Sequence, residues 1–272
     1  MILGLEYGFM RHALLAGSAI AVLSAAVGYF ITLRRQAFAA HALSHVGFTG
    51  AAGAILLGLS PYLGLFAFTL ASGVLLALTG ERLRQRDIGI GMVLMFALGL
   101  GVLFLNLYTA NAQSAMSILF GSIVGVTAGQ AVLSLAVCLA GLGGLAVLWR
   151  PLCFASFNPE GAQARGVNTR QIDLLFILLV AATVAIAVPV IGALLIFALL
   201  IGPAAAAQTL SRSVAGGIGL SVLFGLGITW TGLAAAYAIG YPASTWIASL
   251  SFALYLAAQA WRRLQGGGAR GV

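Results

Sequence analysis

Two histidines, His41 and His45, are the residues of this sequence best suited to metal chemistry. Residues four positions apart lie on one face of an α-helix, one turn from each other. Two neutral imidazole nitrogens at that spacing can share a divalent cation, and zinc is bound in this way at nitrogen distances of about 2.0–2.1 Å. A site with only two protein ligands, completed by water or by a group from a facing helix, would hold an ion briefly rather than trap it. The alternative is that the imidazoles hydrogen-bond to neighbouring carbonyl groups and only fix helix contacts.

The surrounding sequence places this histidine pair inside a membrane. Of the 272 residues, 62% are hydrophobic and 7% are charged, whereas about a quarter of the residues of a soluble domain are charged. Arg34 and Arg35 precede the pair, and arginines beside an apolar run mark the cytoplasmic edge of a bilayer. In a helix that starts after Arg35, His41 would lie roughly 9 Å and His45 roughly 15 Å deep in a hydrocarbon layer about 30 Å thick. Ionisable groups at that depth are expected to face a cavity, a partner or a ligand.

Long stretches without acidic or basic residues predict nine transmembrane helices. A crossing needs about 20 residues, so the first stretch is one span and each later stretch divides in two. The stretches comprise residues 12–33, 36–80, 88–149, 174–211 and 213–261. Turn residues or a polar patch mark the divisions, at residues 58–61, 106–114, 189–192 and 240–242. A re-entrant segment near Pro189 or Pro203 would give eight spans instead.

The arginines predict the orientation of the chain in the membrane. All of them except Arg11 fall in alternate loops, and the positive-inside rule places those loops in the cytoplasm. This pattern needs an odd number of crossings, an N-terminus outside and a C-terminus in the cytoplasm. Residues 1–265 are expected to form a single transmembrane domain, and residues 266–272 a disordered glycine-rich tail.

The segment 150–173 is the longest predicted cytoplasmic loop and contains a predicted short helix. Pro159 suits the first turn of that helix, and Glu160 suits its positive end. Arg165 followed by Gly166 suits its close. A short helix on the cytoplasmic face is a docking surface for a partner.

The sequence excludes several classes of function. It contains no lysine, so it cannot form the GxxxxGK[ST] phosphate-binding loop of an ATPase. Proton-coupled carriers usually hold carboxylates inside the membrane, yet every Asp and Glu lies at or beyond a predicted span end. Neither the carboxylate partner of a Ser-His-Asp hydrolase nor an HExxH metalloprotease motif is present. The chain is therefore expected not to be an enzyme, and its arginines, which border apolar runs, are topology signals rather than a nucleic-acid surface.

Several segments resemble the permease family of bacterial ABC transporters that import zinc, manganese or iron(II). The most specific segment is Leu33 to His45, which resembles the family's arginine pair followed by a GDALSH-like sequence. Leu119 to Ser122 is similar to the family's FGS segment, and Gly192 to Ala205 is similar to its GALLxxALLxxPAA stretch. Pro159 to Val167 resembles its coupling loop.

The resemblance implies an all-helical, polytopic permease of the type II ABC importer kind, which works as a homodimer in the bacterial inner membrane. Its partners would be a cytoplasmic ATPase subunit and an extracytoplasmic metal-binding protein. The coupling loop implies that Pro159, Glu160, Arg165 and Gly166 contact the ATPase. No cofactor is expected to be bound permanently, and the divalent ion is the transported substrate.

Two positions depart from the family pattern. His41 stands where the family commonly has Asp, and Asn158 stands where Asp is expected at the start of the coupling loop. Nitrogen ligands suit zinc whereas oxygen ligands suit manganese, so the first departure favours zinc as the substrate. The sequence leaves open manganese or iron(II) import by the same type of complex, an ion-gradient-driven secondary carrier, and a membrane scaffold with structural histidines.

Overall fold

The computed structural model describes residues 7–78, 83–107, 121 and 123–266. These residues form helices joined by short turns, with no strand among them, and they confirm the predicted all-helical fold. The α-helices are α1 (Gly8–Leu33), α2 (Ala37–Leu56), α3 (Pro61–Leu78), α4 (Leu83–Leu107), α6 (Ala128–Phe157), α7 (Pro159–Ala164), α8 (Thr169–Ile191), α9 (Ala193–Leu210), α10 (Val214–Ile239) and α11 (Ala243–Gly266), and η2 (Ile123–Gly125) is a single 3-10 turn.

Six of the described helices are long and apolar enough to cross a membrane, namely α1, α3, α4 from Asp87 onward, α6, α8 and α10. The helices α2, α9 and α11 have 20, 18 and 24 residues but fall outside this set. Two histidines lower the apolar character of α2. The multi-pass helical architecture agrees with the sequence, and the count of nine crossings stays a prediction.

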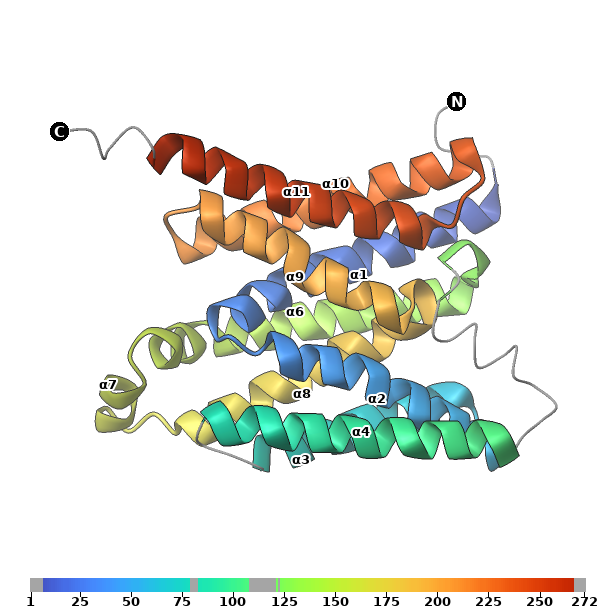
Figure 1. Ribbon diagram of the computed structural model, residues 1–272, viewed down its shortest axis with the longest axis horizontal. Coiled ribbons are helices and arrows are strands. Elements are labelled where there is room, and N and C mark those ends of the chain that lie inside the picture. Colours follow the sequence, from blue (N-terminus) through green and yellow to red (C-terminus); the bar gives the residue numbers. More distant parts are fainter. Residues whose placement is uncertain (1–6, 79–82, 108–120, 122, 267–272) are drawn as a thin grey trace.

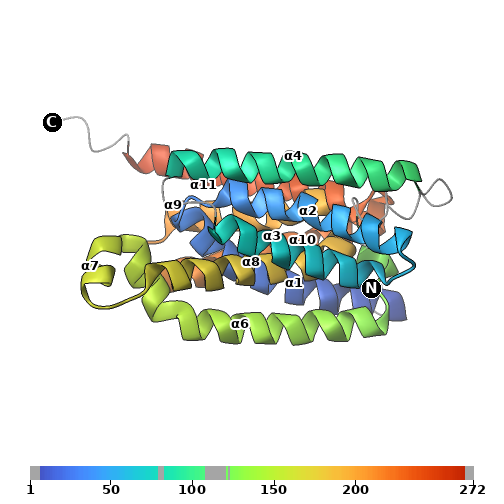
Figure 2. The same ribbon diagram turned by 90° about the horizontal axis from the view of Figure 1, so that it is seen from below.

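The helices form an array with α10 and α11 at one end and α3 and α4 at the other (Figure 1). Between them, α1 packs against α6, α8, α9 and α10, and α8 also packs against α3 and α6. This central position explains why α1 and α8 are the most buried of the six apolar helices. The short helix α7 projects from the bundle beside the ends of α6 and α8 (Figure 2).

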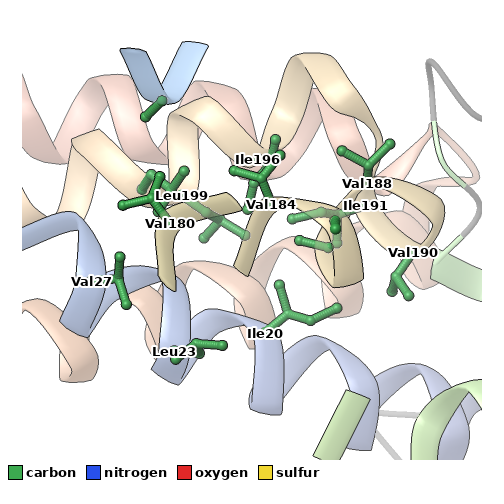
Figure 3. Packing of buried hydrophobic residues seen from close by; sticks show 14 of the residues in the cluster. Ile20, Leu23, Val27, Val180, Val184, Val188, Val190, Ile191, Ile196 and Leu199 are labelled. Carbon is green, nitrogen blue, oxygen red and sulfur yellow. The ribbon is translucent and has the colours of Figure 1, made fainter. Parts of the chain in front are cut away.

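The core lies where α1, α8 and α9 face one another (Figure 3). Its side chains are mostly branched aliphatic residues that interdigitate at close to full burial, and in lipid such van der Waals packing is a main source of helix association. The labelled members from these helices are Ile20, Leu23, Val27, Val180, Val184, Val188, Val190, Ile191, Ile196 and Leu199. The helix that carries the histidine pair, α2, packs against α8 and α9 and so rests on this core.

Glycines allow two pairs of helices to approach closely. A Cβ on Gly50 of α2 would lie 2.3 Å from the carbonyl oxygen of Gly64 in α3, and a Cβ on Gly64 would lie 2.1 Å from that of Gly50. A Cβ on Gly28 of α1 would lie 1.8 Å from the carbonyl oxygen of Leu200 in α9. Small residues at helix interfaces in membranes serve this purpose, and they hold α2 against α3.

Three predicted divisions of the apolar stretches are confirmed, each at a glycine with positive φ. Gly58 follows α2 with a φ of 71°, Gly192 separates α8 from α9 with a φ of 93°, and Gly240 follows α10 with a φ of 80°. Glycine adopts these conformations without the steric cost that a Cβ imposes.

Most of the fourth predicted division, at residues 106–114, and most of the FGS segment lie outside the described residues. Helix α4 ends at Leu107, and residues 108–120 and 122, which include the Phe and Ser of the FGS segment, are not described. Gly121 is described and contacts the turn between α8 and α9, because a Cβ there would lie 2.2 Å from the amide nitrogen of Gly192.

Two long helices extend into the segment 150–173, which the sequence predicts to be cytoplasmic. Helix α6 continues through Pro151 to Phe157, and α8 already begins at Thr169. Proline normally ends or kinks a helix, but Leu152 beside it is fully buried, and this packing favours continuation of the helix. The link between the two long helices is therefore residues 158–168. Similarly, α11 includes Gly266 of the predicted tail, and residues 267–272 lie outside the described residues.

Candidate metal-binding site

A tight corner between α1 and α2 determines where the histidine helix begins. The amide of Gln36 donates to the carbonyl of Ile31 at 2.8 Å, and the amide of Arg35 donates to that of Thr32 at 3.2 Å. This pair of hydrogen bonds is the Schellman arrangement, which usually has glycine in the left-handed position. Here Arg35 holds that position with a φ of 55°, so the chain reverses within three residues and α2 starts at Ala37.

The structure places His41 and His45 together on α2, as their spacing predicts. Their ring centres are 4.7 Å apart and the ring planes meet at 77°. Both side chains are half-buried, and α2 is surrounded by α3, α4, α8 and α9. Two imidazoles this close, at an interface between helices, can bind one ion between them.

The ring of His41 also contacts α9. The ring of Phe197 lies 5.0 Å from it, centre to centre, at an angle of 70°, in the edge-to-face arrangement that aromatic rings favour. Nδ1 of His41 is buried and has no hydrogen-bond partner among the described residues. The nearby hydroxyl of Ser44 donates instead to the carbonyl of His41, at 2.6 Å.

This unpartnered nitrogen is available as a ligand, although other buried polar atoms such as Oγ of Ser24 and Oγ of Ser134 also lack a partner among the described residues. Buried polar atoms are almost always hydrogen-bonded, and one that is not requires an explanation such as a missing ion. In the part of the chain that the structure describes, no group of three or more His, Cys, Asp and Glu side chains is arranged to hold a metal. The histidine pair is thus a candidate site that offers two imidazole nitrogens as ligands.

The four predicted coupling residues lie together on α7 and its ends. The side chain of Asn158 accepts a hydrogen bond from the amide of Gly161 at 2.8 Å, Pro159 occupies the first turn, and Glu160 lies beside it. At the other end, Arg165 caps the helix and Gly166 follows with a φ of 80°. The predicted short helix is confirmed, and all four coupling residues are exposed.

The sequence profile of the ABC 3 transport family matches residues 6–262 of this chain. The chain belongs to the ABC 3 transport family. Family membership confirms the resemblance that the motifs of the sequence indicated.

Individual ABC 3 relatives are named for different metals. The chain is 29% identical over 252 residues to the manganese import system permease protein ScaB of Streptococcus gordonii, with 92% of this chain and 90% of that protein covered. It is 28% identical over 216 residues to the high-affinity zinc uptake system membrane protein ZnuB of Haemophilus influenzae, with 79% and 82% covered. Among solved structures, PsaBC from Streptococcus pneumoniae in complex with Fab matches with a TM-score of 0.83 and 27% identity, over 93% of this chain and 91% of that chain.

An ABC 3 permease is a non-catalytic, multi-pass subunit of the inner membrane, in agreement with the expected lack of enzymatic activity. Membership of an ABC transporter family also implies an ATPase partner and a substrate-binding partner. The named relatives divide between manganese and zinc, so membership alone does not assign the metal.

Two contacts around the site could not be found from the sequence. One is the contact of Phe197 with His41. The other is an ion pair between Arg34, at the end of α1, and Asp173 in α8. Both join residues that are far apart in the chain, and no local pattern signals such pairs.

Proposed function

We propose that this chain is the permease subunit of an ATP-driven importer of divalent metal ions, and that the ion passes His41 and His45. The observation that carries this proposal is the imidazole pair with a ring separation of 4.7 Å and a buried, unpartnered Nδ1 on His41. Membership of an ABC transporter family supports the use of ATP.

Zinc is the proposed substrate. Both candidate protein ligands are imidazole nitrogens, which suit zinc better than manganese, whose preferred ligands are oxygens. The relative named for high-affinity zinc uptake is consistent with this choice. Manganese import by the same type of complex is the second candidate, because other relatives of similar identity are named for manganese.

The proposed mechanism is alternating access. ATP binding and hydrolysis by the partner subunits move the segment that contains α7. The site at His41 and His45 then opens first to the outside and afterwards to the cytoplasm. The affinity for the ion must differ between the two states, because otherwise ATP could not drive net transport. The ATPase would contact the exposed residues on α7 and just after it, namely Pro159, Glu160, Arg165 and Gly166. The arginine pattern assigns this part of the chain to the cytoplasm.

We further infer a single transmembrane domain over residues 1–265, a homodimeric assembly and nine crossings. Nine of the ten described α-helices have 18 residues or more, and the tenth is α7. An extracytoplasmic binding protein would deliver the ion, which is a substrate rather than a resident cofactor.

Metal uptake into proteoliposomes that contain the assembled complex tests this function. We expect ATP-dependent uptake of zinc, with His41→Ala and His45→Ala each lowering the affinity at least about tenfold, the smallest loss seen even for outer-shell partners of metal ligands. The third histidine of the chain supplies a matched control, and His12→Ala should leave uptake unchanged.

Each rival function gives a different result in the same assay. Uptake driven by a proton or sodium gradient without ATP would identify a secondary carrier. Normal uptake after substitution of both histidines would show that the ion takes another path, and lack of any uptake or ATPase stimulation would favour a scaffold.

A further inference from the structure

The guanidinium of Arg34 joins three helices at the end of the bundle where α7 lies. Arg34 is the first residue after α1, and its Nη2 pairs with the carboxylate of Asp173 near the start of α8. Its Nη1 lies 3.5 Å from Oγ of Ser156, in the last turn of α6. Its guanidinium carbon lies 5.6 Å from the ring centre of Phe176 in α8. One side chain thus ties the end of α1 to the helices that lead into and out of α7.

Helix α7 is fastened to the same two helices. The guanidinium of Arg165, its capping residue, lies 5.5 Å from the ring centre of Phe154 in α6. The side-chain amide of Gln163 donates to the hydroxyl of Thr169 in α8 at 3.0 Å. A displacement of α7 therefore acts on the ends of α6 and α8 that hold Arg34.

The other side of this link leads to the candidate metal site. Helix α2 starts three residues after Arg34, and the short corner between α1 and α2 is closed by backbone hydrogen bonds. His41 lies one turn into α2 and contacts His45 in the next turn. A shift of the corner would thus be carried directly into the helix that holds both imidazoles.

The chemistry of the link requires arginine. The guanidinium presents a planar fork of donors that can bind a carboxylate and a second acceptor at once while its face covers an aromatic ring. A lysine ammonium is a point charge and cannot make all three contacts. The side chain of Arg34 is only 10% exposed and that of Asp173 is 32% exposed, so solvent and salt screen this pair less than a surface pair.

We propose that Arg34 is a positioning residue that transmits the movement of α7 to the histidine helix α2, through its contacts with Asp173 and Ser156. The consequence for transport rests on the function proposed above, whereas the mechanical link needs no metal. With the link intact, the ATPase moves α7 and the histidine helix together. With the link broken, α7 moves while α2 stays behind, and ATP hydrolysis is uncoupled from transport.

Environment-sensitive fluorophores on α7 and on α2 test the link directly. The two native cysteines, Cys138 and Cys153, are first replaced by alanine. A single cysteine is then introduced at Ala164 of α7 in one set of proteins and at Phe38 of α2 in another, and both positions are exposed. The permease is assembled with its ATPase subunit in lipid nanodiscs, and the fluorescence change on addition of ATP and vanadate is recorded without metal.

In proteins that retain Arg34 and Asp173, we expect both reporters to respond to ATP. In Arg34→Gln and in Asp173→Asn, the α7 reporter should respond as before, whereas the response of the α2 reporter should fall about fivefold or more, the lower end of the range for coupling between sites. Arg34→Lys, which keeps the charge, should restore part of the response. The matched control is Arg212→Gln, which removes the same charge from an exposed residue in the turn between α9 and α10 and should leave both responses intact.

The proposal is overturned if the α2 reporter responds equally in wild type, Arg34→Gln and Asp173→Asn, or if it does not respond in wild type. Zinc uptake by the same wild-type complexes is measured separately. Loss of coupling between reporters together with absent wild-type uptake would contradict the transport function while supporting the link. Normal zinc uptake by the wild type, with the α2 reporter responding equally in wild type, Arg34→Gln and Asp173→Asn, would support the transport function and contradict the link.

Discussion

At the scale of single residues, the ring of His41 is positioned by aromatic contacts on two sides. Phe197 meets it edge to face from α9, and His45 lies one turn further along α2. Both contacts leave Nδ1 of His41 without a hydrogen bond from the described residues. If the ion passes His41 as proposed, Nδ1 is available as a ligand, and the side chain at position 41 should control which ion is taken.

The substitution His41→Asp should move the selectivity of uptake from zinc towards manganese. A carboxylate replaces an imidazole as ligand, and hard oxygen ligands favour manganese. Competition between the two ions in the proteoliposome assay measures the ratio of their uptake rates. An unchanged ratio in His41→Asp, with uptake intact, would mean that this residue does not contact the ion.

Uptake should also fall in acid. Protons compete with a metal ion for imidazole nitrogens, so metal binding weakens as the pH falls. Initial rates of zinc uptake between about pH 5 and 8 would check this, with ATPase activity at each pH as the control. A rate that stays flat over this whole range would argue against imidazole ligation.

At the scale of elements, the contact between α2 and α3 depends on two facing glycines. A Cβ on Gly50 would clash with the backbone of Gly64, and backbone yields less readily than a flexible side chain. Gly50→Ala should therefore destabilise the protein by about 1–3 kcal/mol, as overpacking of a tight interface does, and lower the thermal midpoint in detergent. Gly99→Ala in α4, where a Cβ would meet nothing within 4 Å, is the matched control and should be neutral or slightly stabilising.

The helix α7 depends on its caps. Asn158→Ala removes the side-chain acceptor for the amide of Gly161, which should cost about 1 kcal/mol and speed hydrogen exchange within Pro159–Ala164 about fivefold. Asn158→Asp keeps an acceptor at the cap and should leave exchange and ATPase stimulation close to wild type. Equal exchange in Asn158→Ala and wild type would show that α7 is stabilised mainly by its contacts with α6 and α8.

At the scale of the whole molecule, the arginine pattern and the helix lengths together predict nine crossings, with the two termini on opposite sides of the membrane. Reporter fusions and accessibility of single cysteines at the two ends should place the N-terminus outside and the C-terminus in the cytoplasm. Termini on the same side would support the eight-span alternative and require one helix to be re-entrant.

The sequence by itself determined the features that depend on neighbouring residues. The ends of α2, α8 and α10 follow from glycines that adopt positive φ, α7 follows from its capping residues, and the adjacency of His41 and His45 follows from the period of the helix. Each of these effects acts within one or two turns, so its signal is local.

Only the tertiary structure decided the features that depend on packing between distant segments. Helix α6 continues past Pro151, and the side chain of Leu152 beside it is fully buried in the core. The contact of His41 with Phe197, and the ion pair of Arg34 with Asp173, exist because α1, α2, α8 and α9 share one core. Residue spacing carries no information about such contacts, since burial and helix packing, which are properties of the whole fold, create them.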